Sequence, residues 1–368
     1  MRSLIIVVKN KCIGPGYPVF IIAEVGVNHN GKLSLARKLI DAAAKAGADA
    51  VKFQTFSPDT LVTKSAEKAE YQKKKENKAN PPKAAFFKKG GIREESQYEM
   101  LERLMLPREY HSKLKRYAEQ KGLIFLSTPF SLSDAEFLRK LGVPAIKVGS
   151  SDTNNIPYLR AIAKWNLPLI LSTGMSDTNE IREAVRTVKN SGNAKLILLH
   201  CTTNYPTPFS EANLRAIQTL QKVFNIPVGF SDHTVGTEAA VAAVALGASV
   251  IEKHFTLNKN LPGPDHKASL EPGELDILVR QIRNIEVALG TGRKMPFPSE
   301  LKTMKVARKS VVTTRKMLKG EIFCNEYNIS AKRPGTGLSP KYLTEIHGKK
   351  ATRDIPVDTV IKKSDYTT

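Results

Sequence analysis

The chain has 368 residues, of which 41% are hydrophobic and 25% charged, as in ordinary globular proteins. This length predicts two or three domains, or one barrel with an appendage. Three scattered cysteines, Cys12, Cys201 and Cys324, argue against a disulfide framework and indicate a reducing compartment. The apolar run at residues 4–8 is too short to span a membrane, and no small-residue cleavage site follows it. We therefore read it as a first strand and expect a cytoplasmic protein with no membrane partner.

The formal net charge is +22 and the pI is about 9.8, which raises the possibility of a nucleic acid partner. The basic residues are spread along the chain, without a basic arm, a zinc module or an RNA-binding aromatic signature. The densest stretch, Lys64–Lys89, has nine Lys against three Glu and is typical of a solvated face. We expect no nucleic acid partner, although part of the charge can attract anionic substrates.

From residue 19 onward, a β-branched apolar run with a polar end recurs and alternates with segments of helical periodicity. Eight such units predict an α/β fold, a (β/α)₈ TIM barrel, and near-continuous apolar strands fit a parallel sheet buried on both faces. A doubly wound open sheet is the alternative, but eight regular units favour closure. The runs are VFIIAEVG (19–26), AVKFQT (50–55), LIFLST (123–128), AIKVGS (145–150), LILSTG (169–174), LILLHC (196–201), VGFSDH (228–233) and VIEKHFT (250–256).

Two segments depart from this alternation. The connection between Thr55 and Leu106 is long and Lys-rich, and we expect it to cover part of the barrel mouth and to be mobile. After a helix that ends near Leu289, GTGRKMPFPSE has the composition of a linker. We therefore divide the chain into a barrel domain with an N-terminal strand (1–289), a linker (290–304) and a small basic domain (305–368) with short strands at KSVVTT and DTVIKK.

Polar side chains gather where the eight runs end, which is where α/β barrels carry their chemistry. Two lysines and several hydroxyls at one mouth predict a pocket for a small carboxylate or phosphate. Single Ser or Thr residues at strand ends are more often turn residues, so the prediction depends on the whole set. His233 and His254 follow successive strands and could share a divalent metal, whereas one histidine alone would more often satisfy a buried hydrogen bond. Glu24 is the candidate acid/base carboxylate.

Several other chemistries lack their sequence signature. Neither GxGxxG nor GxxxxGK[ST] follows a strand, and there is no G-x-S-x-G elbow or Cys–His nucleophile signature. The pattern favours Lewis-acid-assisted addition with an anionic cosubstrate over hydride transfer or acyl-enzyme chemistry.

Nine motifs, with two more in the tail, resemble those of the sialic acid (nonulosonic acid) synthases along nearly the whole chain. They are IAEVGVNHNG, VKFQTF, FLSTPF, KVGSSDTNN, ILSTGM, HCTTNYPTP, GFSDHT, EKHFT and PGPDHKASL, with a tail, KRPGTGLSP and GKKATRDIP, similar to the β-rich antifreeze-like (SAF) domain of that family. The resemblance implies condensation of phosphoenolpyruvate with an N-acylated mannose-type sugar, C–O cleavage of phosphoenolpyruvate and release of phosphate.

The resemblance also implies roles for individual residues. His233 and His254 would hold Mn²⁺, or Mg²⁺ or Co²⁺, which polarises the sugar aldehyde, and Glu24 would be the acid/base group. Arg333 would reach the sugar site of a partner subunit, which implies a domain-swapped homodimer. The phosphoenolpyruvate contacts would be Lys52, Thr128, Lys147, Ser150, Ser172, Thr203 and Ser231, and the sugar contacts Gln54, Tyr205, Asp265 and Arg333.

The identity of the sugar stays open between three classes. The segments KAEYQKKK and SQYEMLERL favour the legionaminic acid branch over N-acetylneuraminate, and PGPD differs from the pseudaminic acid branch. A sibling synthase acting on a sugar phosphate is a further alternative, but such siblings lack the tail domain. A polyanion-binding protein on an inactive barrel is the alternative outside enzymes, and the presence of Glu24, His233 and His254 disfavours it.

Overall fold

The computed structural model describes residues 5–69, 72, 87–88, 91–92 and 95–367. The chain forms two compact units, Met1–Gly290 and Thr291–Thr368. Most of the Lys-rich stretch 64–89 lies outside the described residues, so its expected exposure and mobility stay predictions. In the described residues, no helix is long and apolar enough to cross a membrane.

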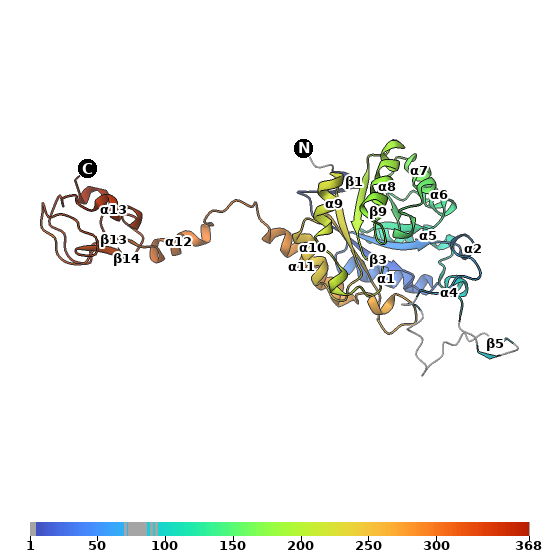
Figure 1. Ribbon diagram of the computed structural model, residues 1–368. Coiled ribbons are helices and arrows are strands. Elements are labelled where there is room, and N and C mark those ends of the chain that lie inside the picture. Colours follow the sequence, from blue (N-terminus) through green and yellow to red (C-terminus); the bar gives the residue numbers. More distant parts are fainter. Residues whose placement is uncertain (1–4, 70–71, 73–86, 89–90, 93–94, 368) are drawn as a thin grey trace. The chain divides into compact units, whose positions relative to one another are not determined.

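The first unit is a parallel barrel in which strands alternate with an outer layer of helices (Figure 1). All eight predicted strands are present, which confirms the predicted fold class. They are β3 (Phe20–Gly26), β4 (Ala50–Thr55), β7 (Ile124–Pro129), β8 (Ile146–Val148), β9 (Leu169–Ser172), β10 (Leu196–His200), β11 (Val228–Asp232) and β12 (Val250–His254).

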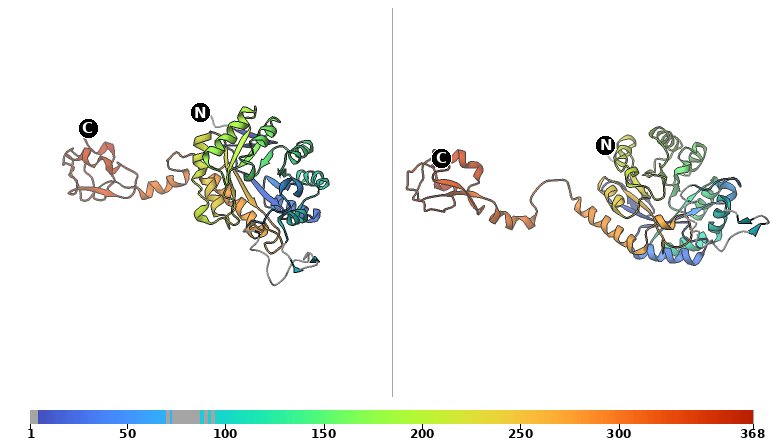
Figure 2. Two further views of the ribbon diagram at one scale, coloured as in Figure 1. Left: turned by 45° about the vertical axis from the view of Figure 1, so that its right-hand side comes forward. Right: turned by 60° about the horizontal axis from the view of Figure 1, so that its bottom comes forward.

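The strands are hydrogen-bonded in the order β7-β4-β3-β12-β11-β10-β9-β8, and the two end strands, β7 and β8, lie in contact. Helices surround this ring, as the second view in Figure 2 shows. They are α1 (Leu33–Lys45), α2 (Pro58–Leu61), α4 (Gln97–Leu104), α5 (Arg108–Gln120), α6 (Leu132–Leu141), α7 (Ile156–Ala163), α8 (Thr178–Asn190), α9 (Ala216–Phe224), α10 (Glu238–Ala245) and α11 (Pro272–Ala288). Short strands β5 (Phe87–Lys88) and β6 (Gly91–Ile92) pair within the long connection.

Local signals set the helix boundaries. Asp177 accepts hydrogen bonds from the first turn of α8 while Glu180 reaches back to the Asp177 amide, a capping box worth about 1 kcal/mol. Gly142 ends α6 in the left-handed conformation (φ 76°), which a residue with a side chain adopts at a cost. These caps turn the chain back toward the next strand.

Alternation along the strands produces the interior of the barrel, because every second residue points inward. Near the amino-terminal ends the inward positions are apolar, for example Phe20, Ala50 and Ile170, and they form one buried cluster. Two to four residues further along, the same face carries the predicted polar side chains. The apolar floor therefore ends where the candidate site begins.

The expected N-terminal strand is instead a hairpin of β1 (Ile6–Val8) and β2 (Lys11–Ile13), with Lys9 in the turn at φ 55°. Ile6, Val8 and Ile13 are buried in the same cluster as the inward residues of the floor. The hairpin thus plugs the amino-terminal end of the barrel.

The second unit contains helix α12 (Pro298–Ala307), strands β13 (Ser310–Thr313) and β14 (Ile329–Lys332), and the short helix α13 (Leu343–Ile346). Helix α12 occupies the last part of the segment that we expected to be a linker. The predicted strand at KSVVTT is β13. DTVIKK lies along it over residues 358–361, with a bridge between Val312 and Val360 and hydrogen bonds from the Ile361 amide to the Val311 carbonyl at 2.8 Å and from the Asp358 amide to the Thr313 carbonyl at 3.0 Å. A core of its own, including Val311, Phe323 and Ile355, holds this unit together.

Candidate active site

A cavity of about 350 Å³ lies at the carboxyl ends of the barrel strands. It brings together every predicted site residue of the first unit. These are Glu24, Lys52, Gln54, Thr128, Lys147, Ser150, Ser172, Thr203, Tyr205, Ser231, His233, His254 and Asp265. Arg333 belongs to the second unit, where it follows β14 and is exposed.

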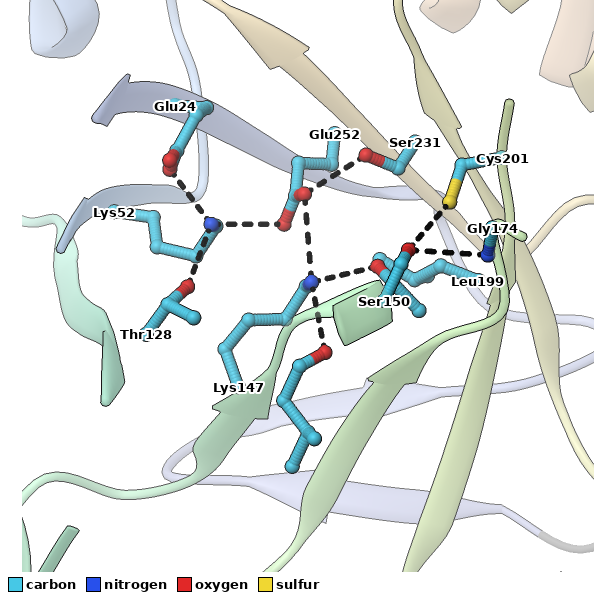
Figure 3. Close-up of polar contacts among 12 residues, drawn as sticks. Glu24, Lys52, Thr128, Lys147, Ser150, Gly174, Leu199, Cys201, Ser231 and Glu252 are labelled. Carbon is cyan, nitrogen blue, oxygen red and sulfur yellow. Dashed lines mark hydrogen bonds and ion pairs between the residues drawn. The ribbon is translucent and has the colours of Figure 1, made fainter. Parts of the chain in front are cut away.

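Two buried lysines and one carboxylate form the base of the cavity (Figure 3). Glu252 lies between them, with its oxygens 3.6 Å from Lys52 Nζ and 3.7 Å from Lys147 Nζ. Lys52 also donates to Thr128 Oγ1 at 2.9 Å, and Lys147 donates to Ser172 Oγ at 2.6 Å. These contacts hold both ammonium groups toward the same space, as a ligand with two anionic groups requires.

The charges in this cluster are mutually stabilised. Although burial alone would raise it, the pKa of Glu252 is lowered to about 2 by Lys147 and Lys52. Burial opposes the charge of Lys52, but Glu24 and Glu252 outweigh it and raise the pKa of Lys52. For Lys147, burial dominates and lowers the pKa. Lys147 therefore depends more on its anionic neighbours to stay protonated.

Glu24 is buried on β3, and its Oε2 lies 2.8 Å from Lys52 Nζ. Burial raises the pKa of Glu24 to about 7, with Lys52 opposing the rise and Glu252 adding to it. Gln54 Nε2 donates to the other carboxylate oxygen at 3.4 Å. A carboxyl group that titrates near neutral pH can both give and take a proton there, as general acid–base catalysis requires.

The two histidines lie side by side, with ring centroids 5.6 Å apart. His233 Nδ1 donates to the Thr202 carbonyl at 2.7 Å, so Nε2 carries the lone pair and has only a long contact of 3.5 Å with Ser231 Oγ, which donates to Glu252. His254 Nδ1 is buried, makes no hydrogen bond within the described residues and lies 3.9 Å from Asp265 Oδ2. Burial lowers the pKa of His233 to about 4 and that of His254 well below its usual value, so both are neutral near pH 7.

The neutral imidazole is the form that binds a divalent metal, so the pair fits such an ion. Among the described residues, no group of three or more His, Cys, Asp or Glu side chains is arranged to hold a metal ion by itself. Two histidines would leave coordination positions for water or substrate.

Ser150, Thr203 and Cys201 form a further wall around Gly174. Ser150 Oγ accepts from the Gly174 amide at 3.0 Å and lies 3.2 Å from Cys201 Sγ. A β-carbon at Gly174 would lie 2.3 Å from Thr203 Oγ1 and 2.9 Å from Ser150 Oγ, so a larger residue here would displace both hydroxyls. Thr203 Oγ1 is buried and makes no hydrogen bond among the described residues, and its hydroxyl can therefore bind a ligand.

Another wall of the cavity is largely apolar and comes from the long connection after β4. Leu61 and Val62 at the end of α2 line the cavity together with Phe130, Gln72 and four residues of α4, Gln97, Met100, Leu101 and Leu104. The Tyr205 ring lies against His233, with ring centroids 4.1 Å apart. The cavity thus combines an anion-binding base with a largely apolar wall that carries two amide side chains.

Some strand-end residues point elsewhere. Ser127 bonds to Thr55, which contacts buried His111, and His200 bonds to the Ala212 carbonyl. Glu252, by contrast, lies at the centre of the site, yet we assigned it no role from the sequence. It precedes His254 by two residues on β12, and this spacing places it on the inward face.

Residues 39–294 match the NeuB family, and residues 308–367 match the SAF domain. The N,N'-diacetyllegionaminic acid synthase of Campylobacter jejuni is 47% identical and covers 93% of this chain and 98% of that protein. The pseudaminic acid synthase of C. jejuni is 40% identical and covers 95% and 96%. The crystal structure of N-acetylneuraminic acid (sialic acid) synthetase from Leptospira borgpetersenii is 36% identical, with a TM-score of 0.69 over 82% and 95% of the two chains.

The fold and these relatives define a barrel enzyme of the synthase class. The chain belongs to the NeuB family, and its second unit carries a SAF domain. The resemblance seen in the sequence is therefore confirmed.

Proposed function

We propose that this enzyme condenses phosphoenolpyruvate with an N-acylated mannose-type sugar and water, giving a nonulosonic acid and phosphate. The observation that carries the proposal is the single cavity that combines two anion-oriented lysines, a carboxyl group with a pKa near 7 and a pair of neutral histidines. Hydride transfer and acyl transfer do not require this combination of lysines, carboxyl group and histidines.

Phosphoenolpyruvate carries a phosphate and a carboxylate, and the base of the cavity offers a cation for each. Lys52 and Lys147 would bind these groups, with hydroxyls from Thr128, Ser150, Ser172, Thr203 and Ser231 as further donors. Both ammonium groups are already held by hydrogen bonds of 2.9 and 2.6 Å, so little side-chain entropy remains to be lost when the anion binds.

His233 and His254 would hold the divalent metal, for which we propose Mn²⁺, with Mg²⁺ or Co²⁺ able to replace it. When bound, this ion would act as a Lewis acid on the sugar aldehyde. As the new C–C bond forms, the aldehyde oxygen becomes a hydroxyl and needs a proton. Protonated Glu24 is positioned to supply it and, once ionised, to accept one from the water that enters the product.

For the acceptor, we propose 2,4-diacetamido-2,4,6-trideoxymannose, the legionaminic acid precursor. Its C6 methyl and second acetamido methyl would pack on Leu61, Met100 and Leu101, the apolar side chains of a wall that also carries Gln72 and Gln97. The identity of 47% with a legionaminic acid synthase, against 40% with a pseudaminic acid synthase, supports the same choice. Gln54, Tyr205 and Asp265 would contact the sugar.

We also propose a homodimer in which Arg333 of one copy reaches the sugar in the other copy's cavity. Its exposure in the second unit is compatible with this role. The cysteines of the described residues are free, which supports the proposed cytoplasmic location.

The test is phosphate release from phosphoenolpyruvate in Mn²⁺ with three acceptors: N-acetylmannosamine, 2,4-diacetamido-2,4,6-trideoxymannose and the pseudaminic acid precursor. We expect the second to have the highest kcat/KM, and preference for another acceptor would reassign the sugar. No release with any of them, together with salt-sensitive binding of DNA, would support the polyanion-binding alternative.

A variant tests the apolar wall directly. Leu101→Gln should lower the ratio of kcat/KM for the deoxy sugar to that for N-acetylmannosamine by about tenfold. This is the discrimination that roughly one methyl group in an apolar pocket provides. Val223→Gln, at an exposed position on α9, is the matched control and should leave the preference unchanged.

A further inference from the structure

The site described above does not use the most deeply buried ion pair of the barrel. Lys253 Nζ lies 2.6 Å from Asp232 Oδ2, and the two side chains are 1% and 0% exposed. They are register partners on the neighbouring parallel strands β12 and β11. Because Ser231 and Glu252 point into the cavity, the next residues, Asp232 and Lys253, point outward toward the helices.

This pair also fixes the chain on both sides of His233. Asp232 Oδ1 accepts hydrogen bonds from the Thr234 amide and the Thr234 hydroxyl, each at 2.8 Å. Lys253 Nζ donates to the Thr234 carbonyl at 2.7 Å. The residues before and after His233 are therefore both attached to Lys253, which itself directly precedes His254.

We propose that Asp232 and Lys253 are positioning residues that set the separation and orientation of His233 and His254. The inference rests on the proposed function, in which the two imidazoles hold one divalent ion. His233 follows the last residue of β11, and the Thr207 amide donates to its carbonyl at 2.8 Å. The three contacts to Thr234 hold this turn from outside the cavity, while the Thr202 carbonyl holds the imidazole from within.

Apolar side chains could fill the volume that Asp232 and Lys253 occupy, so packing alone does not explain a buried ion pair at this position. Two charges removed from water carry a desolvation cost that their attraction offsets only with good geometry and further hydrogen bonds. Here each partner makes additional bonds, and all of those bonds go to Thr234. The hydrogen bonds are thus concentrated on the residue that follows the first metal-ligand candidate.

The test is a double variant, Asp232→Asn with Lys253→Met, which removes both charges together and leaves no isolated buried ion. Asn keeps an oxygen that can accept from Thr234. The matched control is Asp49→Asn with Arg283→Met. Asp49 also accepts a backbone N–H, from Ile21 at 2.9 Å, and pairs away from the cavity with Arg283 at 3.0 Å and with the exposed Lys11 at 2.7 Å.

Mn²⁺ affinity is measured on the full chain by the loss of the free-ion signal in electron paramagnetic resonance. Phosphoenolpyruvate affinity without metal is measured by calorimetry, and folding by circular dichroism. We expect the Kd for Mn²⁺ to rise 10–100-fold in the site variant, as for other residues that orient metal ligands. The Kd for phosphoenolpyruvate should change less than threefold, because Lys52, Lys147 and Ser172 lie on other strands, and Ser231 and Glu252, although on β11 and β12, point to the opposite face from Asp232 and Lys253. The control should change neither constant.

Two results would overturn the inference while the metal site stands. One is an unchanged Mn²⁺ affinity in the site variant, and the other is an equal loss of Mn²⁺ and phosphoenolpyruvate affinity, which marks a general structural role. If the site variant does not fold, Asp232→Asn alone is measured against Asp49→Asn with the same criteria. Absence of Mn²⁺ binding by the wild-type protein would overturn the proposed metal site, and this inference with it.

Discussion

Replacing Lys52 with Met should raise the pKa of Glu24, because Lys52 is the cation closest to that carboxylate. At 2.8 Å and an effective dielectric constant of about 20, the two charges attract by about 6 kcal/mol, or about 4 pKa units. This is an upper bound, since water and neighbouring groups compensate part of the loss. Opposite charges in proteins typically shift a carboxyl pKa by about 1–3 units. We therefore expect the pKa of Glu24 to rise from about 7 to about 8–10.

The assay is a ¹³C NMR titration of protein labelled at the glutamate carboxyl carbons, with the Glu24 signal identified by its loss in Glu24→Gln. Breaking a buried ion pair costs about 3–5 kcal/mol when the remaining charge cannot neutralise. Glu24 can take a proton near neutral pH, so Lys52→Met should still fold. Lys259→Met, which removes the partner of Glu274, is the control and should leave Glu24 unchanged. A midpoint that stays at about 7 in Lys52→Met would refute the reasoning.

Three further predictions concern Glu24, His233 and the second unit. Because the pKa of Glu24 is 4.5 in its unperturbed state and about 7 when folded, its stabilising contribution is full below pH 4.5 and is lost as the pH rises through 7, by about 3 kcal/mol in total. Urea unfolding at pH 5 and pH 8 should therefore differ less in Glu24→Gln than in the wild type, and an equal difference would contradict the burial argument. His233→Ala should abolish Mn²⁺-dependent phosphate release with an unchanged circular dichroism spectrum, and wild-type turnover would disprove the metal role. A chain that ends at Gly290 should fold, since the core of the first unit lies within it, but it should lose most of its activity because Arg333 is removed. Full activity of this shortened chain would exclude a role for the second unit.

The strands and the cavity were predictable because alternation in a parallel barrel is local and repeats eight times. The strand that contains His254 shows where local reasoning ends. Its sequence places Glu252 on the inward face, but the contacts of Glu252 with Lys52 and Lys147 join β12 to two strands, β4 and β8, that are not its neighbours. Only closure of the barrel creates them.

The N-terminal hairpin shows a different limit. Residues 4–8 have the composition of a strand, and we predicted a single strand there. The turn that follows, at Lys9 and Asn10, lacks the Asn-Gly or Gly-X pair typical of a two-residue hairpin loop, so the sequence did not indicate the pairing with β2. Likewise, DTVIKK has the composition of a strand, but its backbone hydrogen bonds with β13 come from residues 358–361, around the bridge at Val360. Side-chain composition does not fix how many residues pair.

The hairpin fills the amino-terminal end of the barrel, so ligands reach the cavity from the carboxyl ends of the strands. The lysines at its base are more deeply buried than Gln54 and Tyr205, which lie nearer the mouth. Phosphoenolpyruvate must then enter before the sugar, and phosphate cannot escape until the sugar acid above it has left. Steady-state kinetics should accordingly show ordered binding, with phosphate as a competitive inhibitor of phosphoenolpyruvate and not of the sugar. A random order of binding would contradict this arrangement of the cavity.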